Sequence, residues 1–207
     1  MFVLTADQVD SRSSADRVAA MIDALNSGPI HPVLSADRTA GDELQILVEG
    51  GADALALILH LTRTGQWSVG CGAGTVNSPL PGNIREAAGD AFIAARRAVD
   101  RAKKRPTRFA LETEPATAPA ADGEALIDLL LALRARRSPE GWELHDILDG
   151  TDLTQADAAQ RLGISPQAVS LRARAGELRT EQAALEPLAR ILDQLGSVKP
   201  MTPGGGS

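Results

Sequence analysis

The chain has 207 residues and a net charge of −6, so it can form one large domain or two small ones and is too acidic to coat nucleic acid by general positive charge. Aromatic residues make up only 2% of the chain, which excludes a single-strand nucleic-acid groove lined by stacking rings. The one cysteine, Cys71, cannot form an internal disulfide, and no stretch resembles a signal peptide or membrane span, so a soluble cytoplasmic protein is expected.

The first half of the chain predicts an α/β domain over residues 1–111. Short apolar runs alternate with stripes in which apolar residues recur at helical spacing. A hairpin tip is expected where Gly41 supplies a permissive backbone. The order β-α-β-β-α-β-α-β contains the ferredoxin-like unit. Strands are expected at 2–5, 33–34, 44–48, 67–74 and 108–111, and helices at 15–25, 52–62 and 91–104.

A stretch rich in Pro and small residues, 112–123, has no apolar period and predicts a linker. Beyond it, residues 124–195 predict an all-helical domain. Residues 196–207 end in Gly-Gly-Gly-Ser and are expected to be a disordered tail. The helices of the second domain are expected at 124–137, 139–148, 155–162, 166–177 and 180–195.

Residues 151–177 carry the capping signals of two helices joined by a short turn. Thr154 and Ser165 suit the two N-caps, and Pro follows Ser165 at the first helical position. Gly163 suits the left-handed residue that ends the first helix, and Val169 would point back into the pair. These features predict a helix-turn-helix, so the fold class is α+β: a ferredoxin-like α/β sandwich plus an all-α helix-turn-helix domain.

The second helix of this pair leaves a set of side chains free for a DNA groove and its phosphates. From Leu153 to Ser170 the sequence resembles the helix-turn-helix of region-4-type sigma factors and related bacterial regulators, through the pattern LTQ-x-x-x-A-x-x-LGIS-x-x-AVS. The resemblance implies binding to double-stranded DNA. The expected DNA-binding residues are Ser165, Gln167, Ser170, Leu171, Arg172 and Arg174.

Residues 151–195 contain five Arg and six acidic residues, so this segment is not basic. A monomer would therefore bind DNA weakly, and a homo-oligomer or a palindromic site is expected. Two alternatives stay open, namely a helix pair that binds another protein and an ordinary helical hairpin.

Two carboxylates in the first half are candidates for a metal site. Asp7 ends the first strand, and Asp42 lies at a hairpin expected beside that strand. Carboxylates that converge from neighbouring strands can hold Mg²⁺, which prefers hard oxygen ligands and phosphates. The alternative is that Asp7 caps a turn and that Asp42 lies on a solvated hairpin tip.

Residues 2–105 resemble the palm of class III nucleotide cyclases and diguanylate cyclases. The similarity lies in the Gly-Asp-Glu turn at 41–43, the glycine-rich strand 68–74 and the helix 97–103, and it implies that Arg96 and Lys103 contact a nucleotide. The SatD family of bacteria is a closer match, through Ala-Asp-x-x-x-Ser-Arg at 6–12 and Gly-Asp-Glu-x-Gln at 41–45. Further basic residues that could bind phosphate or lie on a solvated helix face are Arg85, Arg97, Lys104 and Arg105.

Two functions follow from these features. The preferred one is a DNA-binding transcriptional regulator whose first domain senses a ligand or dimerises. The alternative is a Mg²⁺-dependent nucleotide-binding or nucleotidyl-transfer enzyme with cyclase-like activity. No catalytic residue is assigned, because the asparagine of the cyclase helix has no counterpart. The three histidines form no metal spacing with Cys71, and His60, within an apolar helix, is expected to be buried.

Overall fold

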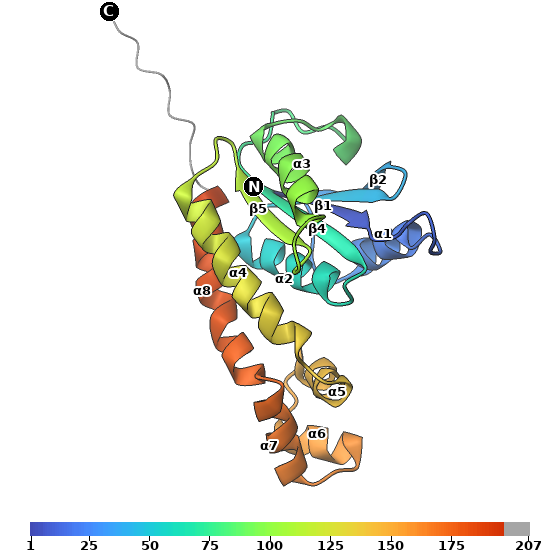
Figure 1. Cartoon of the computed structure of the whole chain (residues 1–207), viewed down its shortest axis with the longest axis vertical. Coiled ribbons are helices and arrows are strands. Elements are labelled where there is room, and N and C mark those ends of the chain that lie inside the picture. The colour runs from blue at the N-terminus through green and yellow to red at the C-terminus, as the bar shows by residue number, and fades with distance from the viewer. Residues whose placement is uncertain (197–207) are drawn as a thin grey trace, which may run out of the picture.

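The computed structural model describes residues 1–196, and within them the chain is an α+β protein with one five-stranded mixed sheet and eight α-helices (Figure 1). The expected tail lies almost wholly outside the described residues. The strands are β1 (Phe2–Gln8), β2 (Leu34–Ala40), β3 (Glu43–Val48), β4 (Trp67–Ala73) and β5 (Phe109–Thr113). The helices are α1 (Val18–Ser27), α2 (Gly51–Thr62), α3 (Asp90–Ala102), α4 (Ala118–Ala135), α5 (Pro139–Leu148), α6 (Gln155–Leu162), α7 (Pro166–Ala175) and α8 (Leu178–Gly196), with a 3₁₀ turn at Ile84–Glu86.

The sheet has the strand order β2-β3-β1-β4-β5. β1 lies in the centre and pairs antiparallel with both β3 and β4, and β2 pairs antiparallel with β3. β5 is added parallel to β4 at the edge, after the crossover through α3. The hairpin between β2 and β3 turns at Gly41, whose φ of 47° is the left-handed conformation expected from the sequence.

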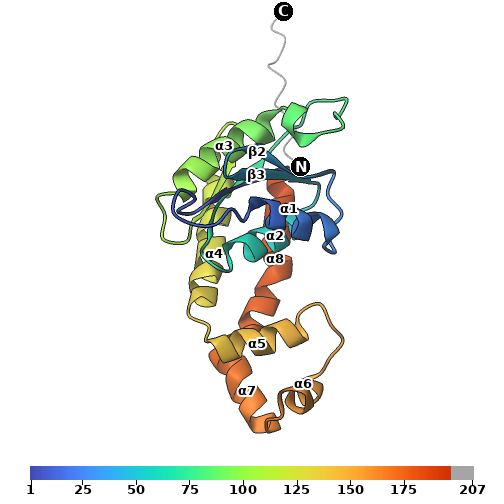
Figure 2. The ribbon, with the colours of Figure 1, turned by 90° about the vertical axis from the view of Figure 1, so that its right-hand side faces the viewer.

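Side chains of β1 alternate between two buried faces of the sheet. Phe2 and Leu4 belong to the main core, which is covered by α1 and α2, whereas Val3 belongs to a second cluster on the α3 face. α3 approaches that face closely because Gly70 and Gly72 of β4 have no side chains to hold it away. Figure 2 shows α3 on one side of the sheet and α2 on the other.

The prediction of a linker at residues 112–123 is wrong for most of that segment. Residues 112–113 belong to β5, and α4 already begins at Ala118, with the Thr117 side chain accepting a hydrogen bond from the Ala120 N–H. The segment reads as a linker because of its prolines, but Pro119 lies in the first helical turn, where no backbone hydrogen bond is lost. Alanines around it are strong helix formers.

The boundary between two separate domains at 112–123 is wrong as well, because α4 and α8 complete the core of the α/β part. Ile127 of α4 and Leu192 of α8 are fully buried in the same cluster as Phe2 and Leu4. The helices α5, α6 and α7 form a separate small core around Leu144. They project as a lobe from the end of the α4–α8 pair (Figures 1 and 2). Among residues 1–196, no helix has the length and apolar character needed to cross a bilayer.

Candidate functional site

The lobe contains two short helices joined by a tight turn. Thr154 and Asp157 form a reciprocal capping box at the start of α6, in which the Asp157 N–H donates to the Thr154 hydroxyl and the Thr154 N–H donates to the Asp157 carboxylate. Gly163 ends α6 with φ 63°, and the Ile164 N–H donates to the Ala159 carbonyl. The capping residues and the helix boundaries of α6 agree with the sequence prediction.

The two faces of α7 differ sharply in exposure. Val169 is fully buried and Ala173 is 6% exposed, and both pack in the lobe core. On the opposite side Gln167 and Arg174 are exposed, and Leu171 has 65% of its surface exposed. α7 therefore builds the lobe with one face and leaves the other free for a partner.

The remaining residues predicted to bind DNA have partners within the lobe. Ser165 caps α7, since its hydroxyl accepts from the Ala168 N–H at 3.2 Å. The Ser170 hydroxyl donates to the Gln155 side chain at 3.3 Å and stays exposed. Arg172 lies 3.1 Å from Glu143 of α5, with 27% of its side chain exposed, so it holds α7 against α5 instead of pointing outward.

A cleft of about 260 Å³ lies beside α7 and α6. Arg174 and Arg179 both line it, and neither has an ion-pair partner within residues 1–196. The Gln155 amide and the Ser170 hydroxyl lie in the same wall. These two guanidinium groups outnumber the one carboxylate that lines the cleft, Glu177, and with the hydroxyl and the amide they form a suitable contact for a phosphate.

The structure brings the two predicted metal ligands to one end of the sheet. The Gln8 N–H donates to the Asp42 carbonyl at 3.0 Å, and Asp7 lies opposite Glu43 in the β1–β3 pairing. The Asp7 carboxylate, however, pairs with Lys103, which directly follows α3, at 2.7 Å. The Asp42 carboxylate accepts a hydrogen bond from Ser11, which lowers the pKa of this group.

The residues expected to contact a nucleotide lie at the same place. Lys103 pairs with Asp7, and Arg96 lies 2.6 Å from Glu43, which is 5% exposed. Lys103 and Arg96 are therefore neutralised by Asp7 and Glu43, whereas the Asp42 carboxylate is held by the Ser11 hydroxyl. Within residues 1–196, no three His, Cys, Asp or Glu side chains form a group able to hold a metal ion.

Most of the other basic residues in the first half also form ion pairs. Arg105 pairs with Glu124 of α4 at 2.8 Å, and Arg101 pairs with the same carboxylate at 2.6 Å. These contacts join α3 to α4. Arg97 pairs with Glu114, and Arg85 lies 3.0 Å from Asp37, whereas Lys104 is exposed.

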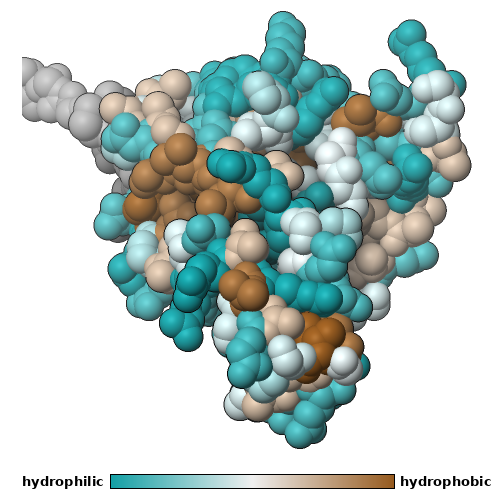
Figure 3. Space-filling view, turned by 60° about the horizontal axis from the view of Figure 1, so that its bottom comes forward, coloured by the Kyte–Doolittle hydropathy of each residue, from teal (hydrophilic) through white to brown (hydrophobic). Residues whose placement is uncertain are grey.

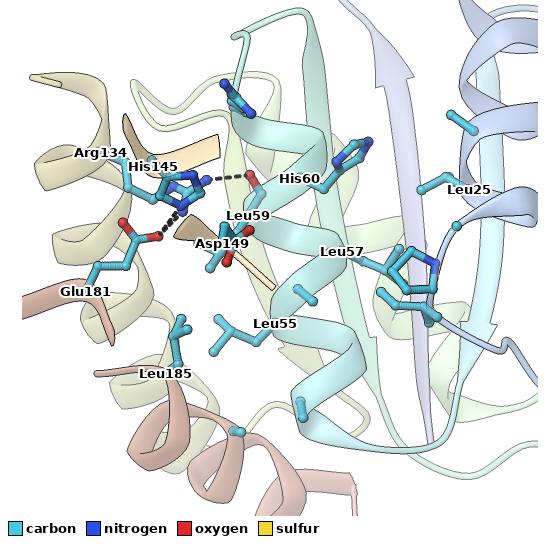
Figure 4. A pocket seen from close by; sticks show the side chains of 18 of the residues that line it. Leu25, Leu55, Leu57, Leu59, His60, Arg134, His145, Asp149, Glu181 and Leu185 are labelled. Carbon is cyan, nitrogen blue, oxygen red and sulfur yellow. Dashed lines mark hydrogen bonds and ion pairs between the residues drawn. The ribbon is translucent and has the colours of Figure 1, made fainter. Parts of the chain in front are cut away.

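A cavity of about 560 Å³ lies where the α/β part meets the lobe (Figure 4). Its apolar lining comes from α1, α2 and α8, including Leu25, Leu55 and Leu185. Its polar end includes His60 and His145. The expected burial of His60 is wrong, since the residue is exposed at the rim of the cavity. Partial burial of the ring still lowers its pKa, and the charges of nearby arginines lower it further.

A buried charged cluster forms the wall between this cavity and the lobe. Glu181 of α8 contacts both Arg134 of α4 and Arg137, which follows α4, and these two arginine side chains are 7% and 0% exposed. Three arginine side chains lie over the Trp142 ring at 4.4–4.8 Å, namely Arg134, Arg137 and Arg63, which directly follows α2. Burial alone would raise the pKa of Glu181, but polar contacts with its neighbours and the arginine charges lower it to about 2.

The sequence prediction missed both the cavity and this cluster. The lining residues come from five helices, and only tertiary packing brings them together. One signal was available, because Arg134 continues the buried stripe of Ile127, Leu130 and Leu131 at helical spacing. A charged residue at such a position requires a buried partner.

Comparisons with known proteins give no relatives for this chain: no family model, curated protein or solved structure matches it.

Proposed function

We propose that the protein is a transcriptional regulator that binds double-stranded DNA through α6 and α7. The observation that carries this proposal is the free outer face of α7, with Gln167, Leu171 and Arg174 exposed, on a helix whose inner face is fully packed. An exposed helix of this length fits a major groove. There an amide can hydrogen-bond to adenine, and an apolar side chain can contact a thymine methyl group. A guanidinium group can hydrogen-bond to guanine or to a phosphate.

We infer further that the α/β part has a ferredoxin-like topology and acts as the ligand-sensing part. The first four strands lie in the order β2-β3-β1-β4 with antiparallel neighbours, which is the arrangement of the β-α-β-β-α-β unit. The junction cavity supports a sensing role, since it is lined by α1 and α2 on one side and by His145 of the lobe on the other. A small molecule bound there would contact both parts.

Arg174→Ala is expected to weaken DNA binding about five- to a hundredfold, the range for loss of one base or phosphate contact. Binding would be measured by gel shift with a library of genomic fragments, at about 50 mM and about 200 mM salt, because phosphate contacts weaken as salt rises. Arg190→Ala is the matched control, since Arg190 is an exposed arginine of α8 whose one ion pair among the described residues is with Glu186.

Absence of any shift by the unaltered protein at the lower salt would refute DNA binding. Equal shifts for all fragments at both salt concentrations would show that the protein binds DNA without sequence specificity. That result would refute a role as a transcriptional regulator. Equal losses for Arg174→Ala and Arg190→Ala would show that α7 is not the contact surface.

Binding of a nucleotide with Mg²⁺ is a second function, and the charged groups at this end of the sheet support it. Lys103 and Arg96 already contact Asp7 and Glu43 there. A nucleotide phosphate would replace these carboxylates as the partner of the two cations, and the released Asp7 with Asp42 could then hold the metal.

Asp42→Asn is expected to abolish any increase in thermal midpoint that Mg²⁺ and a nucleoside triphosphate together give the unaltered protein. Each of the four ribonucleoside triphosphates would be tested with and without Mg²⁺ in a thermal-shift measurement. Asp23→Asn is the control, because Asp23 is an exposed carboxylate of α1 away from the sheet end. A shift that survives in Asp42→Asn would place the binding site elsewhere.

A further inference from the structure

The outer face of α4 carries a continuous apolar stripe, although its inner face already packs in the core. The stripe consists of Ala125, Leu126, Leu129 and Ala132, which lie within one side of the helix, and Leu133 at its edge packs against the main core. Leu129 is 69% exposed and Leu126 is 44% exposed. Figure 3 shows apolar side chains gathered on the side of the molecule that α4 occupies in Figure 1. Single exposed leucines are ordinary, but a contiguous patch indicates a contact surface.

Two opposite charges lie at the ends of this stripe, at equal distances from its centre. Asp122 precedes Leu129 by seven residues and Arg136 follows it by seven, so both lie on the same side of the helix as Leu129, two turns away. Both are exposed, and neither forms an ion pair within residues 1–196.

We propose that the α4 stripe is the interface of a homodimer, in which α4 packs antiparallel against α4 of a second copy with the two-fold axis at Leu129. Each Leu129 then meets its counterpart, as a two-fold interface requires. Asp122 of one copy faces the partner's Arg136, and the reverse pair forms at the other end. Ala125 and Ala132 are small enough to let the two helices approach closely.

The symmetry of the sequence around Leu129 selects a second copy over an unrelated partner. The helix carries a negative charge at one end of the stripe and a positive charge at the other, at equal distances from the apolar centre. When a second copy of the helix is placed against it in the opposite direction, each charge meets its opposite. A parallel arrangement in register would instead place Asp122 against Asp122 and Arg136 against Arg136, which repel. The antiparallel pair is therefore the arrangement that satisfies both ends.

The charge pattern allows a test in which one change can rescue another. The mass and dimer dissociation constant would be measured by sedimentation over a wide concentration range. Asp122→Arg alone and Arg136→Asp alone should each raise the dissociation constant about tenfold, and Leu129→Ala by at least as much. The double variant Asp122→Arg with Arg136→Asp restores opposite charges and should return the constant to within about threefold of the original.

Ile93→Ala is the matched control, because Ile93 is an apolar residue of α3 with 53% of its surface exposed and lies outside the stripe. Circular dichroism of each variant would show that it is folded. A monomer at every concentration would overturn the proposal. So would a dimer that Leu129→Ala leaves unchanged, or a double variant no better than the single ones. None of these outcomes depends on whether the protein binds DNA.

Discussion

Gly72→Ala is expected to destabilise the protein by about 3 kcal/mol or more, the upper range for inserting atoms into a packed core. A Cβ at this position would lie 2.1 Å from the Ala91 carbonyl oxygen and 2.2 Å from the Ala95 nitrogen. Both are backbone atoms of α3, so no side-chain rotation can relieve the contact. α3 would have to move away from β4, and the contacts of Val3 and Leu47 with it would be lost.

The loss of stability would be measured as a lower midpoint of urea unfolding, with unfolding followed by circular dichroism. Gly82→Ala is the control, because Gly82 has no atom within 4 Å of an added Cβ and no positive φ. Its free energy of unfolding should change by less than about 0.5 kcal/mol. Equal midpoints for the two variants would contradict the close packing of α3 on β4.

Glu181→Gln is expected to cost about 3–5 kcal/mol, the range for removing one partner of a buried ion pair. Arg134 and Arg137 would remain buried without a carboxylate to neutralise them. The cost would be measured as a lower urea midpoint, with unfolding followed by circular dichroism. Glu186→Gln is the control on the same helix, because the Glu186 side chain is 86% exposed and should contribute less than about 1 kcal/mol.

The lowered pKa of the Glu181 carboxylate also predicts that the folded protein loses stability in acid. Its pKa is about 2 in the folded protein and 4.5 in its ordinary state. A lowered pKa stabilises the fold above pH 4.5, and this contribution of up to about 3 kcal/mol is lost as the pH falls from 4.5 to 2. The unaltered protein should lose more stability over this interval than Glu181→Gln. Parallel curves for the two would contradict the assignment.

Local signals in the sequence were sufficient to predict most elements of the fold. The strands and helices of the first half depend on apolar periodicity, and the ends of α6 and α7 depend on caps such as Thr154, Gly163 and Ser165, all of which act within a few residues. The convergence of Asp7 and Asp42 followed from one hairpin beside one strand.

Predictions that depended on distant partners were less successful. Pro119 suggested a linker, but burial of Gly123 and Ile127 against the sheet part stabilises a helix there. Arg172 was expected in a DNA groove, yet a glutamate 29 residues earlier in the chain holds it. No local pattern reveals such pairings, because they depend on which helix packs beside which.

Pro187 lies inside α8, the helix that joins the lobe to the sheet part. The helix starts in the lobe at Leu178 and ends against the sheet part at Gly196, so it spans the junction between them. A proline in mid-helix removes one backbone hydrogen bond, and bending therefore concentrates in the turn around it. Glu186 and Ala189, on either side of this turn, both line the junction cavity. A molecule bound in that cavity would therefore contact α8 at the turn where its backbone hydrogen bonding is interrupted.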